Sequence, residues 1–165
     1  MAEVLNIFQS TPEPQRQTTF DLNKLTEQFK TQRATDWTIP EAFLCLLLSA
    51  ASADGVVAAE EQAEILALAR RSRALKTVSA PQLATANATV TQRLKERPAG
   101  LQEACESLPA DMRLPVFAHC VDIVLADGAL QQIEAEFLNK IVGFLALEAA
   151  ESKRVMEVML VKNRF

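Results

Sequence analysis

Two short stretches of the chain place acidic side chains in the same pattern. SAASADGVVAAEE covers residues 49–61, and DIVLADGALQQIE covers residues 122–134. Each contains Ala-Asp-Gly, with a glutamate seven residues after the aspartate. The four acidic residues are Asp54, Glu61, Asp127 and Glu134. Carboxylates are the ligands that hard divalent cations such as Ca²⁺, Mg²⁺ and Mn²⁺ prefer, so the pattern raises the question of a cation site.

The twelve-residue EF-hand calcium loop is the first motif to test. It requires glycine at its sixth position and glutamate at its twelfth, and both stretches satisfy this requirement. Its first and third positions must supply oxygen ligands. Here they would be Ala50 and Ser52 in one stretch, and Ile123 and Leu125 in the other. These residues cannot supply the missing carboxylates, so we reject an EF-hand.

A second candidate pair lies in the apolar segment VFAHCVDIVLA. His119 and Asp122 are its only ionisable side chains besides the cysteine, and their spacing puts them on one face of a helix. Such an apolar helix is predicted to be central and buried. A buried carboxylate needs a partner, which would be His119, a backbone donor, a base from another helix, or a metal. Three interpretations remain open: an internal His–Asp pair, ligands of a cation, or a catalytic pair in which Asp122 orients a His119 base. Adding His119 to the carboxylates would favour Zn, Fe or Mn over Ca or Mg.

The rest of the sequence favours an all-α fold. Of the 165 residues 49% are hydrophobic and only four are glycine, and good helix formers are plentiful. Apolar residues recur at helical spacing between Pro, Gly and polar breaks. We predict a compact bundle of about seven helices. Near the start of the chain, Leu22, Leu25 and Phe29 also recur at helical spacing. The main predicted helices cover approximately residues 39–52, 59–73, 81–97, 101–108, 112–126, 132–145 and 149–162.

The two Ala-Asp-Gly stretches also suggest an internal repeat. An offset of 73 residues aligns Asp54 with Asp127 and Glu61 with Glu134, and it aligns the apolar positions of the flanking helices. We therefore predict two pseudosymmetric units, each a helix, an Ala-Asp-Gly turn and a second helix, around a buried pair of helices.

Composition limits the partners and the compartment. The formal net charge of −4 and the lack of a basic stripe argue against nucleic acid. The longest apolar run, residues 42–53, is shorter than the ~20 residues that span a bilayer, and no secretory signal is visible. Three cysteines without metal-type spacing do not indicate a disulfide framework. We expect a cytoplasmic location and no transmembrane segment.

The longer segments AFLCLLLSAASADGVVAAEE and LPVFAHCVDIVLADGALQQIEAEFLNKIVGFLAL resemble the tellurite-resistance TerB-like family. The resemblance covers approximately residues 40–162. It implies an all-helical cytoplasmic domain linked to stress or metal-oxyanion resistance, with a suspected acidic metal site and no established enzymatic activity. Asp54, Glu61, Asp127 and Glu134 match the family's acidic positions. The family often has Ser or Thr three residues before each Glu, whereas this chain has Ala58 and Gln131.

On this basis we divide the chain into a flexible arm, residues 1–20, and a single TerB-like helical domain, residues 21–165. The first functional hypothesis is a non-enzymatic stress-response module with a divalent-metal site, and its candidate ligands are Asp54, Glu61, His119, Asp122, Asp127 and Glu134. An alternative is a helical interaction domain with purely structural turns, which would dock a protein partner that could be membrane-associated. A third is an enzyme that uses His119 and Asp122. The identity of the metal and the oligomeric state stay open.

Overall fold

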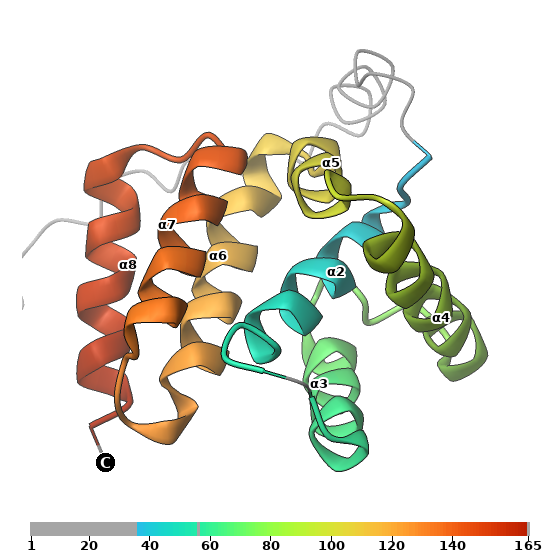
Figure 1. Ribbon diagram of the computed structural model, residues 1–165, viewed down its shortest axis with the longest axis horizontal. Helices are drawn as coiled ribbons and strands as arrows, with labels where there is room; N and C mark the ends of the chain where they lie inside the picture. Colours follow the sequence, from blue (N-terminus) through green and yellow to red (C-terminus); the bar gives the residue numbers. More distant parts are fainter. Residues whose placement is uncertain (1–35, 56, 165) are drawn as a thin grey trace, which may run out of the picture. The chain divides into compact units, whose positions relative to one another are not determined.

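The computed structural model describes residues 36–55 and 57–164, except for the side chain of Asp127. This part of the chain forms seven α-helices and one short 3₁₀-helix and has no strand, which confirms the all-α fold (Figure 1). All of it belongs to one unit, residues 32–165. The predicted arm, residues 1–20, and the helical spacing at residues 22–29 lie outside the described residues. The helices are α2 (Ile39–Ala51), α3 (Ala59–Arg71), α4 (Ala80–Glu96), α5 (Gly100–Ser107), α6 (Ala110–Val124), α7 (Gln132–Phe144) and α8 (Ala149–Lys162), with the 3₁₀-helix η1 (Leu125–Asp127) between α6 and α7.

The centre of the domain is α2. Its start is defined by a capping box, in which the Glu41 carboxylate accepts the Thr38 N–H at 2.9 Å and the Thr38 hydroxyl oxygen accepts the Glu41 N–H at 3.4 Å. Every residue of 42–48 is buried, so this helix is apolar on all sides. An apolar surface of this kind is buried only if other elements pack against every side of the helix. Helices α3, α4, α5 and α6 all pack against α2 (Figure 1).

The main partner of α2 is α6, which also contacts α7 and α8. The two helices meet through apolar side chains, and the ring of His119 in α6 lies edge-on to Phe43 in α2, with centroids 5.6 Å apart. In Figure 1, α6, α7 and α8 run side by side, while α3 and α4 lie on the other side of α2. The buried pair of helices that the sequence predicts is therefore α2 and α6.

The three cysteines are part of the core. Cys45, Cys105 and Cys120 are fully buried and unbridged. Burial raises the pKa of the Cys45 and Cys105 thiols to about 12 and that of Cys120 well above its ordinary value. Neutral, buried thiols act as small apolar side chains.

The two Ala-Asp-Gly turns share their local hydrogen bonds. The Gly55 N–H donates to the Ser52 carbonyl and the Gly128 N–H to the Leu125 carbonyl, at 3.2 and 3.0 Å, which are equivalent positions in the repeat. The turns differ in conformation, because only Gly128 has a left-handed backbone, with φ of 84°. The surroundings differ too: α3 packs chiefly against α2, whereas α7 contacts α2, α5 and α6. The equivalence is local, and pseudosymmetric packing of two whole units stays a prediction.

Within residues 36–55 and 57–164, every helix is too short or too polar to cross a membrane.

Candidate functional site: an acidic groove

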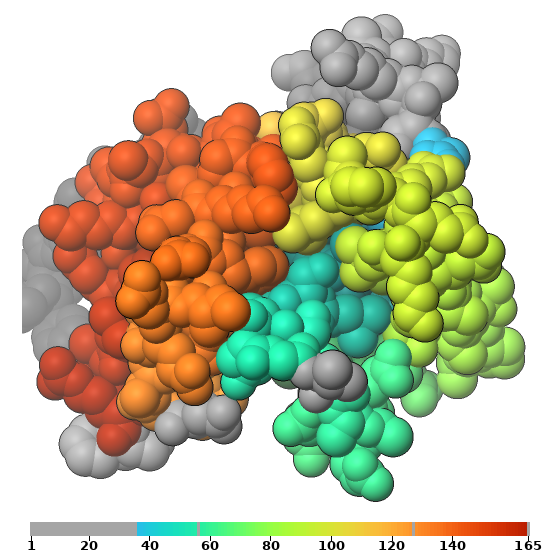
Figure 2. Space-filling model, viewed as in Figure 1, coloured from blue at the N-terminus to red at the C-terminus, as the bar shows by residue number. Residues whose placement is uncertain are grey.

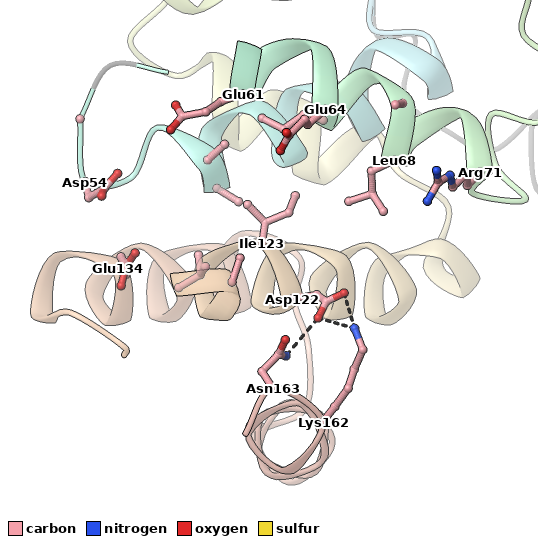
Figure 3. Close-up of a pocket in the computed structure, with 17 residues that line it drawn as sticks. Asp54, Glu61, Glu64, Leu68, Arg71, Asp122, Ile123, Glu134, Lys162 and Asn163 are labelled. Atoms are coloured by element: carbon pink, nitrogen blue, oxygen red, sulfur yellow. Dashed lines mark hydrogen bonds and ion pairs between the residues drawn. The ribbon is translucent and has the colours of Figure 1, made fainter. Parts of the chain in front are cut away.

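Both Ala-Asp-Gly turns lie at one open groove of about 830 Å³. One wall comes from the end of α2 and from α3, and the other from α6, η1 and the start of α7, while the end of α8 closes one side (Figure 3). The acidic residues that line it are Asp54, Glu61, Glu64, Asp122 and Glu134, and the basic ones are Arg71 and Lys162. Four of the six residues predicted as ligands thus line one groove, although they are up to 80 positions apart in the chain.

The first turn places Asp54 and Glu61 on the α3 wall. Asp54 is exposed in the turn. Glu61 lies in the first turn of α3, where its Oε2 atom accepts the Ala58 N–H at 2.9 Å. This is half of a capping box, because Ala58 has no side-chain acceptor for the reciprocal bond. Among the described residues, no donor to Glu61 Oε1 is seen.

The second turn positions Glu134 in the same way. Its Oε2 atom accepts the Gln131 N–H at 2.7 Å, and the residue is only 6% exposed. The missing Ser or Thr at Ala58 and Gln131 therefore does not prevent the glutamate from capping the helix start. Asp127 is the last residue of η1, but its side chain lies outside the described part of the chain.

Asp122 is paired with a residue from another helix. The Lys162 ammonium, at the end of α8, lies 2.5 and 2.6 Å from its two carboxylate oxygens, and Asn163 Nδ2 donates to Oδ1 at 3.1 Å (Figure 3). The side chain is 25% exposed, so the expectation of a fully buried carboxylate is corrected. Burial alone would raise the pKa of Asp122, but the bonds from Lys162 and Asn163 outweigh it and lower the pKa.

His119 is not among the residues that line the groove. It is half-buried against Phe43, and burial lowers its pKa more than the charge of Asp122 raises it. The hydrogen bonds of Asp122 go to Lys162 and Asn163 instead of His119, so the interpretation as an internal His–Asp pair is corrected. The imidazole thus lies outside the lining of the groove, and its role as a metal ligand stays a prediction.

Sequence reasoning missed three features of the groove. Glu64 is one helical turn beyond Glu61, on the same face of α3, so the i, i+3 spacing could have indicated it. A base from another helix was among the expected partners of Asp122, but no local pattern identifies Lys162, which is 40 positions away, as that base. The apolar part of the groove, which includes Leu68 and Ile123, was also not foreseen (Figure 3).

The groove is acidic without forming a compact set of ligands. Among the described side chains, no three from His, Cys, Asp and Glu converge closely enough to hold a metal ion. Direct coordination by three or more carboxylates would therefore require side chains to move.

Comparison with known proteins assigns the family. The model of the family "Tellurite resistance protein TerB" matches residues 40–157, well over half of the chain. No significant match was found among curated proteins or solved structures. The matched region runs from the first turn of α2 into α8 and includes both Ala-Asp-Gly turns. The chain therefore belongs to the TerB tellurite-resistance family.

Proposed function

We propose that this protein is a non-enzymatic, cytoplasmic stress-response module of the TerB type whose acidic groove binds a hydrated divalent cation. The observation that carries the proposal is the convergence of the two turns on one groove. Asp54 and Glu61 come from one side and Glu134 from the other (Figure 3). The turns are far apart in the chain, and local turn chemistry alone does not require their carboxylates to share a groove.

The charge balance supports a cation. Five carboxylates line the groove against two basic side chains, and one of these, Lys162, is already paired with Asp122. Like charges that share a site repel each other, and a divalent cation relieves that repulsion. Asp54 and Glu64 are both exposed, so they can turn towards an ion at little cost.

The donor set favours Mg²⁺, Ca²⁺ or Mn²⁺ over zinc. The lining groups are carboxylates, and His119 lies outside the groove, so the nitrogen ligand that would favour zinc is missing. Mg²⁺ commonly keeps several waters and binds through one or two carboxylates. Binding of this kind fits a groove whose carboxylates are near one another without forming a closed cage.

A binding role suits the side chains better than catalysis. The three thiols are fully buried, and their raised pKa values keep them protonated. The single histidine packs on Phe43 away from the groove. The groove is thus lined by carboxylates without a nucleophile and base in mutual contact.

Thermal melts of chelator-treated protein with added Mg²⁺, Ca²⁺, Mn²⁺ or Zn²⁺ test the proposal. An ion that binds only the folded state raises the melting temperature. The Asp54→Asn/Glu64→Gln variant should lose this rise, since it removes two groove charges. The matched control is Glu60→Gln/Asp111→Asn, which removes two exposed charges outside the groove and should keep the rise. If no ion raises the melting temperature of the wild type, the proposal is wrong.

A further inference from the structure

The groove has an apolar floor because α3 covers only part of its neighbours. This helix packs chiefly against α2, and only Ile65 and Ala69 on it are buried hydrophobic residues. In the space-filling view, α3 projects at the lower edge, apart from the segment that contains α7 (Figure 2). Closer packing of α3 against α6 would cover apolar side chains between them. These side chains instead line the groove.

The larger apolar side chains of the floor come from both walls. Leu68 on α3 and Ile123 on α6 point into the groove from opposite sides (Figure 3). The other apolar lining residues are Ala51, Ala67 and Ala126, together with Ala50, Ile65 and Val124, which are already buried. A floor of this kind gains free energy when other aliphatic side chains exclude water from it. A hydrated metal ion makes no use of these residues.

Charge is distributed unevenly along the groove. Asp54, Glu61 and Glu134 lie towards the two turns, whereas Arg71 lies at the far end of α3 (Figure 3). An occupant that complements this surface carries positive charge over the turns and aliphatic groups over the floor. Five carboxylates line the groove against two basic side chains, so charge complementarity favours a basic occupant over an acidic one.

The chain itself shows how the groove accepts a basic side chain from a helix. Lys162 extends from the last turn of α8 and places its ammonium on both oxygens of Asp122, and the neighbouring Asn163 adds a hydrogen bond. The side chain of Lys162 is 55% exposed. A lysine on an approaching helix could bind Asp54 or Glu64 in the same manner, because both carboxylates are exposed.

We propose that the groove docks an amphipathic helical segment of a partner protein that carries lysine or arginine beside leucine, isoleucine or valine. This is the helix-in-groove mode of recognition, in which apolar anchors enter the floor and flanking charges set the orientation. The chemistry is the same whether the partner is cytoplasmic or attached to a membrane. This inference goes beyond cation binding and does not depend on it, although both proposals involve the carboxylates of the groove.

A fluorescent synthetic peptide, helical, with leucines on one face and lysines flanking them, serves as the probe. Its affinity for the full-length chain is measured by anisotropy with EDTA present, so that no cation is required. We expect saturable binding that weakens with added salt. The Asp54→Lys/Glu64→Lys variant should bind roughly tenfold more weakly or worse. Leu68→Gln/Ile123→Gln should also weaken binding, but its loss should not depend on salt.

Three controls decide the result. Glu60→Lys/Asp111→Lys makes the same charge change away from the groove and should bind as the wild type does. A peptide with glutamate in place of lysine, and one with serine in place of leucine, should both fail to bind. Circular dichroism checks that each variant is folded. Equal weakening by both charge-reversed variants, or binding without saturation, would overturn the docking proposal. If no cation stabilises the wild type but the peptide still binds, only the cation proposal would be overturned.

Discussion

The ammonium of Lys162 lies 2.5 and 2.6 Å from the two carboxylate oxygens of Asp122, and this ion pair joins the end of α8 to the last turn of α6. Lys162→Met should therefore weaken the attachment of the last turn of α8. The lysine is 55% exposed, so solvent screening limits the loss in the free energy of unfolding to about 0.5–1 kcal/mol. Urea denaturation measures it.

Lys153→Met provides the matched control. Lys153 lies on the same helix, but its contact with Glu157 is 3.9 Å long and both side chains are mostly exposed. Its removal should change stability by only a few tenths of a kcal/mol. A loss for Lys162→Met no larger than that of the control would show that the α8 ion pair does not contribute to stability.

The lowered pKa of Asp122 predicts how stability depends on pH. Asp122 binds its proton less readily in the folded state than in the unfolded state. The stabilisation is therefore fully present above the unfolded value of about 3.8 and is lost as the pH falls through the lower folded value. The stability difference between wild type and Asp122→Asn should be largest near pH 6 and should shrink towards pH 3. A constant difference over that range would contradict the ion pair as its cause.

His119 should act over a different pH window. Burial lowers its pKa, so the unfolded chain binds the proton first as the pH falls below about 6.5. The wild type should lose stability between pH 7.5 and pH 5 relative to His119→Gln, because glutamine does not titrate. Denaturation curves of both proteins at these two pH values measure the change. If the stability difference between the two proteins is the same at both pH values, the His119 ring accepts a proton as easily in the folded state as in the unfolded state.

Ala146 is the one described residue other than glycine with positive φ, at 50°. It follows α7, and the Leu147 N–H donates to the Val142 carbonyl, as in a Schellman motif. Glycine adopts this conformation without strain. Ala146→Gly should therefore raise the free energy of unfolding by about 0.5 kcal/mol, the relief of strain being partly offset by a more flexible unfolded chain.

The control for this change is Ala88→Gly, at an exposed position inside α4. In a helix interior glycine costs about 1 kcal/mol relative to alanine. The two substitutions are chemically identical, so opposite signs would isolate the effect of the backbone conformation. A loss of stability in both variants would mean that Ala146 is not strained.

Arg113, near the start of α6, forms hydrogen bonds to carbonyl groups at the ends of two other helices. Its guanidinium donates to the Leu108 carbonyl at 3.0 Å, after α5, and to the Leu145 carbonyl at 3.2 Å, after α7. Arg113→Met should cost about 1–3 kcal/mol, because partly buried carbonyls lose their donors. The exposed Arg154 on α8 makes a suitable control for urea denaturation, and Arg154→Met should be nearly neutral. Equal effects of the two changes would refute the bridging role of Arg113.

Local sequence patterns predicted the helices and the acidic residues at the helix starts, but not the contacts between helices that complete the groove. Apolar spacing and helix caps act within a few residues, so the positions of Glu61 and Glu134 at their helix starts follow from sequence alone. The direction in which a helix face points depends on what packs against it. The pairing of Asp122 with Lys162, and the position of His119 against Phe43, arise from contacts between separate helices, and the chain carries no local signal for them.

The burial of α2 on all sides limits how the domain can be divided. The first Ala-Asp-Gly unit reads in the sequence as half of a duplication, yet its leading helix contacts α4, α5 and α6 as well as α3. A fragment that ends after α3 would expose a helix with apolar side chains in every direction, and such a surface promotes aggregation. Truncation at the boundary of the repeat should thus yield an insoluble product, whatever similarity the two halves share. Any ancestral half with this helix would have needed a second copy of itself, or another protein, to cover it.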